Sequence, residues 1–217
     1  MAARLKFFGW GREGEGLTPA EVDFILARAH ARFGVPGFDA VAPPALAALR
    51  LSPPRLAPPP ALASLCSSEI YDRAAHTYGK SFLETVRGLA GDYADAPDIV
   101  AYPRTEADVA ALLDWAGGAQ MAVIPFGGGS SVVDGVAARI DARHRGALTI
   151  DLREMGRVIE IDRASRAARI EGGAFGPALE AQLRPHDLTL RHFPQSFEYS
   201  TLGGWIATRS GGHFATL

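Results

Sequence analysis

Three consecutive glycines, residues 127–129, follow an apolar run in the stretch VIPFGGGSSVVDGV, and Ser130 and Ser131 come directly after them. Glycine has no Cβ, so successive N–H groups of such a loop can form a shallow anion site and approach a phosphate closely. The two serines add hydroxyl donors, whereas no lysine lies in this stretch. The alternative is a flexible turn between two strands, which glycine runs commonly form.

Neither of two well-known phosphate-binding motifs is present. The dinucleotide motif G-x-G-x-x-G fails because Val132 stands where the third glycine is required. The P-loop motif fails because the GKS triplet at residues 79–81 has Ala74 where its first glycine should be. The glycine loop alone therefore leaves both interpretations open.

A second glycine-containing segment, PQSFEYSTLGGWIATRSGG, spans residues 194–212. Ser200 and Thr201 precede a short apolar run, which predicts a helix start where their hydroxyls and free N–H groups converge on one spot. Gly203 and Gly204 permit a close approach of backbone. The alternative is a capped helix with a packing face of small residues.

Residues 1–93 are predicted to form a helical N-terminal extension. The stretch TPAE at 18–21 predicts a capped helix with proline at its first position, ending near Gly34. The proline-rich residues 42–60 predict a linker or an extended wrap, because proline removes backbone donors and fixes φ. A second helix is predicted over residues 69–87.

Residues 94–217 are predicted to form an α+β domain with a mixed sheet. Strands at 99–102 and 121–125 flank a helix that begins at Thr105, where Asp108 completes a capping pair, and this unit predicts a parallel strand pair. The short turns REMG and DRAS predict antiparallel hairpins between three further strands, around residues 148–152, 157–161 and 168–171.

The composition describes an ordinary globular protein of 217 residues, with 47% hydrophobic and 21% charged residues. A net charge of -2 gives no positive field, so we expect no nucleic-acid partner. Cys66 is the single cysteine, which excludes an intrachain disulfide and a multi-cysteine metal site. Lysine occurs only as Lys6 and Lys80; this arginine bias is typical of a GC-rich bacterial genome.

No segment approaches the ~18 apolar residues of a transmembrane helix, and no targeting signal is visible, so we expect a cytoplasmic bacterial protein. The histidines predict no metal site, because none has a second ligand at a recognisable spacing. His192 and His213 flank the second segment, where a structural role is more common than a catalytic one. No carboxylate stands at a recognisable spacing from His30, His76, His144 and His186.

Several pieces of the sequence together resemble the FAD-binding domain of the FAD-linked oxidase family, also called the vanillyl-alcohol-oxidase or PCMH type. Their order and spacing are more specific than any one piece, and they are IPFGGGSSV, TIDLREMGRVIEID, RIEGGAFGPALEAQL and FPQSFEYSTLGGWIATRSGG. The likeness starts at FFGWG, residues 7–11, and covers nearly the whole chain. Within the family, the sequence resembles the branch of alkylglycerone-phosphate synthase and its bacterial relatives.

The resemblance implies which residues bind FAD. The glycine loop would wrap the pyrophosphate with Pro125, Phe126, Gly127, Gly128, Gly129, Ser130 and Ser131. The flavin and its ribityl chain would be lined by Gln195, Ser196, Phe197, Glu198, Tyr199, Ser200 and Thr201. A further contacting stretch would be Thr208, Arg209, Ser210 and Gly211. Relatives often carry an acidic residue at the position of Gln195, so any role that depends on a negative charge there is in doubt for this chain.

Some family members attach FAD through a histidine of the glycine loop. Residues 127–132 contain none, so we expect non-covalent FAD. In the family the FAD-binding domain continues beyond the point corresponding to Leu217, and a cap domain that binds the substrate and holds the catalytic residues follows it. We therefore expect this chain to be the N-terminal part of a longer enzyme, truncated within its FAD-binding domain, with homodimer formation left open.

Three functions stay open at this stage. The resemblance implies FAD-dependent exchange of an acyl chain for an alkyl chain on dihydroxyacetone phosphate, with a lipid-like or other small substrate held by the cap. The second is an oxidoreductase that takes hydride from a 2-hydroxy acid such as lactate or glycolate. The third is a non-catalytic remnant.

Overall fold

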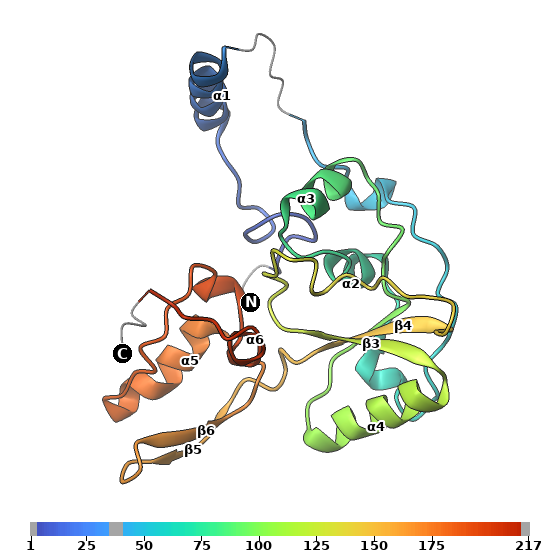
Figure 1. Cartoon of the computed structure of the whole chain (residues 1–217), viewed down its shortest axis with the longest axis vertical. Coiled ribbons are helices and arrows are strands. Elements are labelled where there is room, and N and C mark those ends of the chain that lie inside the picture. Colours follow the sequence, from blue (N-terminus) through green and yellow to red (C-terminus); the bar gives the residue numbers. More distant parts are fainter. Residues whose placement is uncertain (1–3, 35–40, 214–217) are drawn as a thin grey trace.

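The computed structural model describes residues 4–34 and 41–213, so the outer limits of the two predicted regions, residues 1 and 217, lie outside the described residues. Two bodies lie next to each other (Figure 1). One is built around a four-stranded sheet, and the other holds a two-stranded hairpin with two short helices. Helix α1 (Pro19–Phe33) projects away from both.

A mixed sheet with the strand order β1-β2-β4-β3 forms the centre of the first body. Strands β2, β4 and β3 run parallel, and β1 pairs antiparallel with β2. Strand β4 is buried at every position, as expected for a central strand whose two faces are covered. The strands are β1 (Cys66–Ser67), β2 (Ile99–Ala101), β3 (Met121–Phe126) and β4 (Gly146–Asp151).

The predicted strand–helix–strand unit exists, but its strands are not direct neighbours. β2 and β3 each pair with β4, which lies between them. The REMG turn therefore makes no hairpin, and that prediction was wrong. The apolar run of β4 is buried between two parallel neighbours. In the sequence, such an apolar run looks the same whether the strand is central in a parallel sheet or belongs to a hairpin. The DRAS hairpin is confirmed, since β5 (Val158–Asp162) pairs antiparallel with β6 (Ala167–Ile170).

Helix α4 (Glu106–Gly118) packs on the sheet through Leu112 and Ala116, both fully buried. Its predicted cap is confirmed: Thr105 Oγ1 accepts the Asp108 N–H at 3.1 Å. The capping box of α1 at residues 18–21 is also confirmed, and Gly34 ends that helix in the left-handed conformation with φ of 62°. None of the α1 residues is buried, so this helix contributes nothing to the core.

The predicted helix over residues 69–87 is interrupted. α2 (Ile70–Ala75) and α3 (Phe82–Leu89) replace it, because Ser81 and Glu84 form a capping box that starts a new helix. Glu84 also accepts the N–H of Gly79 at 2.9 Å, which fixes the connecting loop. The helical spacing of apolar residues had suggested one element where local capping makes two.

The proline-rich residues form an extended segment along the first body, as predicted, apart from one short 3-10 turn at Leu46–Ala48. The second body adds α5 (Gly176–Leu183) and α6 (Leu202–Ala207). Further 3-10 turns are Ala63–Leu65, Arg184–His186 and Phe197–Tyr199. Within residues 4–34 and 41–213, no helix combines the length and apolar character that crossing a membrane would need.

Candidate cofactor site

The glycine loop starts at the carboxyl end of β3, directly after Phe126. No acceptor within the described part of the chain receives the backbone N–H groups of residues 127–132. Only Gly129 of these six residues is buried, so their main-chain N–H groups are open to solvent or to a ligand. Such a run of main-chain donors is the arrangement that binds anions, and it fits the diphosphate of FAD.

The glycines of this loop bring it against the second segment. A Cβ on Gly127 would overlap the Thr201 side chain, and a Cβ on Gly128 would overlap the Tyr199 carbonyl. The glycine loop and the second segment thus pack closely against each other, although about seventy residues separate them in the sequence. The two predicted cofactor-binding stretches are therefore in contact in the fold.

A cavity of about 650 Å³ opens where the two stretches meet. Five of the predicted residues line it: Ser130, Gln195, Ser196, Tyr199 and Ser210. Five residues that were not predicted complete the lining: Trp10, Val132, Pro194, Gly212 and His213. Pockets of 300–1,000 Å³ are the common size for small ligands and cofactors, so this cavity is the candidate flavin site.

Ser200 and Thr201 do not offer free groups to this cavity. The Ser200 hydroxyl donates to the Ser196 carbonyl and accepts the Trp205 indole N–H, both at 2.7 Å. The first N–H groups of α6 donate to the carbonyls of Ala174 and Gly172, at 2.9 and 2.8 Å. The expectation of free donors converging at this helix start was wrong, because the preceding loop satisfies them. These residues hold the second segment in place.

The other predicted residues lie around the cavity rather than in its wall. Phe197 stacks on Trp205 inside the second body, and the Thr208 hydroxyl donates to the Gly204 carbonyl at 2.8 Å. Ser131 Oγ accepts the Gly135 N–H at 3.0 Å and closes the glycine loop. Outside the cavity wall, the solvent-exposed members of the set are Pro125, Glu198, Thr208, Arg209 and Gly211. Gln195, which lines the cavity, is exposed as well.

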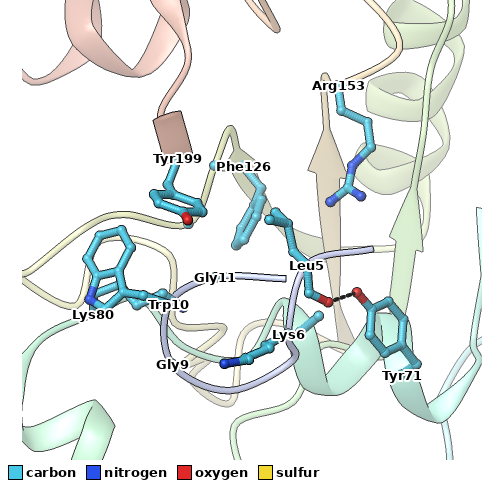
Figure 2. A pocket seen from close by; sticks show the side chains of 13 residues that line it. Leu5, Lys6, Gly9, Trp10, Gly11, Tyr71, Lys80, Phe126, Arg153 and Tyr199 are labelled. Carbon is cyan, nitrogen blue, oxygen red and sulfur yellow. Dashed lines mark hydrogen bonds between the residues drawn. The ribbon is translucent and has the colours of Figure 1, made fainter. Parts of the chain in front are cut away.

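An N-terminal loop, residues 4–15, completes the site, and the residue-level reasoning had missed it (Figure 2). Trp10 packs edge-on against Tyr199, with ring centroids 5.4 Å apart. The Tyr71 hydroxyl donates to the Leu5 carbonyl at 2.5 Å, so the loop contacts both bodies. The FFGWG motif could have indicated this loop, because aromatic residues in a glycine-rich stretch are typical of a packed loop.

A buried charge network lies behind the glycine loop. His76 Nε2 is 2.8 Å from Asp151 Oδ2, and His76 Nδ1 is 2.6 Å from the Asp72 carbonyl. This carboxylate comes from β4, 75 residues away, so no recognisable spacing in the sequence indicated it. Arg153 also binds Asp151, at 2.6 Å. Burial alone would raise the pKa of the Asp151 carboxyl, but His76 and Arg153 outweigh it and the pKa is lowered.

Other histidines have structural partners. The His192 ring packs against Trp205 in a tilted arrangement, with centroids 5.0 Å apart, and lies 3.3 Å from the Ser210 hydroxyl. His144 lies 3.1 Å from Asp141. His144 therefore also has a carboxylate partner, contrary to expectation. In the ranges that the structure describes, no group of three or more His, Cys, Asp or Glu side chains could share a metal ion.

Comparison with known proteins decides the family. The sequence model of the FAD binding domain matches residues 97–217. The chain belongs to this FAD-binding domain family. A solved structure of an alkyldihydroxyacetonephosphate synthase superposes with a TM-score of 0.81 at 29% identity, covering 96% of this chain and 42% of that one. The α+β FAD-binding fold and the resemblance to this branch are thereby confirmed.

Two curated relatives have different printed activities. Alkyldihydroxyacetonephosphate synthase of Dictyostelium discoideum is 40% identical over 141 residues, which are 65% of this chain and 23% of that protein. D-2-hydroxyglutarate dehydrogenase of Pantoea ananatis is 31% identical over 153 residues, 61% of this chain and 14% of that protein. The chain thus spans less than a quarter of the length of these two relatives.

Proposed function

We propose that this chain forms part of the FAD site of a flavoenzyme that exchanges an acyl chain for an alkyl chain on dihydroxyacetone phosphate. The observation that carries the proposal is the superposition of 96% of the chain on an alkyldihydroxyacetonephosphate synthase with a TM-score of 0.81. The 40% identity with the Dictyostelium discoideum synthase supports the same branch. The substrates, the cap domain and any dimer belong to the proposal.

The residues of this chain bind and orient the cofactor in this proposal. The unpaired N–H groups of residues 127–132 hold the diphosphate, and the wall of the 650 Å³ cavity holds the flavin end. Ser200 and Thr201 act from behind, since their hydroxyls fix the backbone that faces the loop. FAD, when bound, supplies the reactive isoalloxazine ring. The residues proposed to form the FAD site are 125–131, 195–201 and 208–211.

Attachment of the cofactor is non-covalent in this proposal. The glycine loop offers amides, serine hydroxyls and no histidine or cysteine as a point of covalent attachment. The purified chain mixed with FAD should show flavin absorbance that persists through desalting and is released entirely by acid precipitation. Protein that never retains flavin would contradict the FAD site, and flavin left in the acid precipitate would contradict non-covalent binding.

A second candidate function has its own support. The 31% identity with a D-2-hydroxyglutarate dehydrogenase favours oxidation of a 2-hydroxy acid as the alternative reaction. The test is an assay of the longest natural product of the gene with both substrate classes. Formation of an ether lipid without net flavin reduction supports the exchange reaction. Bleaching of the flavin by lactate, glycolate or 2-hydroxyglutarate, without ether-lipid formation, overturns it in favour of oxidation.

A further inference from the structure

The two lysines of the chain line the same small pocket beside the glycine loop. This pocket, of about 30 Å³, is bordered by Lys6 and Lys80 together with Arg153 (Figure 2). Among the described residues that border it there are three cations and no carboxylate. Gly128 and Gly129 form another part of its wall, so the unpaired N–H groups of the glycine loop begin at the pocket.

Lys80 is fixed to the glycine loop by its own backbone. The Lys80 N–H donates to the Ser131 carbonyl at 2.6 Å, and a Cβ on neighbouring Gly79 would overlap that carbonyl. Its ammonium lies 5.8 Å from the centroid of the Trp10 ring. Burial lowers the pKa of the Lys80 amine, although the charge of Glu84 partly opposes this. An ammonium held away from water in this way gains from an anion placed beside it.

The nearby carboxylates already accept hydrogen bonds. Glu15, whose Oε2 lies beside Gly11 as the Lys6 ammonium does, accepts the Arg12 N–H at 2.6 Å. Glu84 accepts the N–H groups of Gly79 and Ser81, at 2.9 and 3.1 Å. Asp151 is shared between Arg153 and His76. His76 lies between the Asp72 carbonyl and the Asp151 carboxylate, 2.6 and 2.8 Å from them. Glu84 and Asp151 are thus hydrogen-bonded to groups other than the two lysines.

Lys6 is held in place by the packed N-terminal loop. The Lys6 N–H donates to the Gly11 carbonyl at 3.1 Å, and Leu5 pairs with Arg12 as an isolated bridge. Phe7 packs against Tyr93 with ring centroids 6.2 Å apart. A lysine on such a loop is a positioned charge rather than one on a loose tail.

We propose that Lys6, Lys80 and Arg153 form a phosphoryl-binding pocket next to the glycine loop. Clustered lysine and arginine side chains beside free main-chain amides match the charge and the acceptor oxygens of a phosphoryl group. The phosphoryl group is either that of the FAD diphosphate or that of a separate phosphate monoester, and only the first source rests on the function proposed above.

The test is a titration of the purified chain with inorganic phosphate, followed by the fluorescence of Trp10 next to Lys80. Lys80→Met and Lys6→Met should each weaken phosphate binding by about 10-fold or more, the size of one lost charge-assisted contact. Lys80→Arg should restore binding. Arg143→Gln is the matched control, because Arg143 is exposed and its ion pair among the described residues is with Asp141, outside the pocket wall. Trp10→Phe should remove the signal and identify its source.

The same titration with saturating FAD separates the two sources. Loss of phosphate binding in the presence of FAD, with weaker FAD binding by Lys80→Met, assigns the pocket to the cofactor diphosphate. Phosphate binding that persists with FAD bound, with unchanged FAD affinity in Lys80→Met, assigns it to a separate monoester. No phosphate binding by the wild-type chain, or equal binding by the lysine variants and the control, overturns the proposal. Binding of phosphate without any binding of FAD would overturn the proposed function alone.

Discussion

Gly128 lies where the two halves of the proposed cofactor site touch. We expect Gly128→Ala to lower the free energy of unfolding by about 1–3 kcal/mol, the usual cost of overpacking, and to reduce bound FAD. The physical reason is the overlap of the new Cβ with the Tyr199 carbonyl, a backbone group that cannot rotate away. Urea unfolding and the flavin content after desalting measure the two effects.

Gly117→Ala is the matched control for this substitution. Gly117 is exposed on α4 and a Cβ there would have no neighbour within 4 Å. Alanine should therefore stabilise the chain by about 1 kcal/mol through helix propensity and leave FAD content unchanged. A Gly128→Ala protein as stable as the wild type, with full flavin content, would show that the two loops do not pack as described.

Cys66 should be a poorly reactive thiol. Burial raises its pKa to about 11, so the thiolate that attacks alkylating reagents is scarce at neutral pH. At pH 8 we expect alkylation by iodoacetamide on the order of 100-fold slower than for an ordinary thiol with a pKa of ~8.5. Mass spectrometry of the timed reaction measures the rate, and the urea-unfolded chain is the control. Equal rates for the folded and unfolded chain would be inconsistent with this burial.

At the scale of elements, two helices carry the same kind of cap in different settings. Thr105 caps α4, which packs on the sheet, and Thr18 caps α1, none of whose residues is buried. We expect Thr105→Ala to lower the free energy of unfolding by about 1 kcal/mol. Thr18→Ala should reduce helical content locally and leave the main unfolding transition in place, because α1 is not part of the core.

Circular dichroism and urea unfolding followed by tryptophan fluorescence separate these two effects. Trp115 lies within α4 and Trp205 within α6, so fluorescence reports on the packed bodies. Equal shifts of the unfolding midpoint for both threonine variants would mean that α1 folds together with the sheet.

At the scale of the whole molecule, long-range carboxylate contacts set the response to acid. Asp98 accepts from Arg55 at 2.7 Å and from the Ala147 N–H at 2.7 Å, which joins the extended segment to β4. Burial would raise the pKa of Asp98, but these hydrogen bonds lower it, as the contacts of Asp151 do for that residue. Both groups bind fewer protons in the folded chain than in the unfolded one.

The stability from a carboxyl with a lowered pKa is fully present above the pKa of an unfolded Asp, ~3.9, and is lost as the pH falls through the folded value. We expect equal urea midpoints at pH 7 and pH 6 and a falling midpoint from about pH 5 to pH 3. Asp98→Asn should be less stable at pH 7 and less sensitive to acid. A midpoint independent of pH down to pH 3 would contradict these contacts.

Local sequence signals determined several parts of this protein. The capping boxes at Thr18 and Thr105, the DRAS hairpin and the glycine loop after β3 were all predictable, because caps, tight turns and glycine runs depend on residues a few positions apart. The family resemblance could also be read from the order of motifs. The helix start at Ser81 was a local signal that apolar spacing concealed.

Only the tertiary structure decided what those local elements meet. The insertion of β4 between β2 and β3, the pairing of His76 with Asp151 and the filling of the α6 donors by residues 172–174 all join distant parts of the chain. The same holds for the two lysines, which lie far from the glycine loop in sequence and beside it in space. Residue spacing specifies contacts between residues a few positions apart. Strand order and charge partners join residues that are far apart in the sequence, and they depend on how whole elements pack, so no local pattern predicts them.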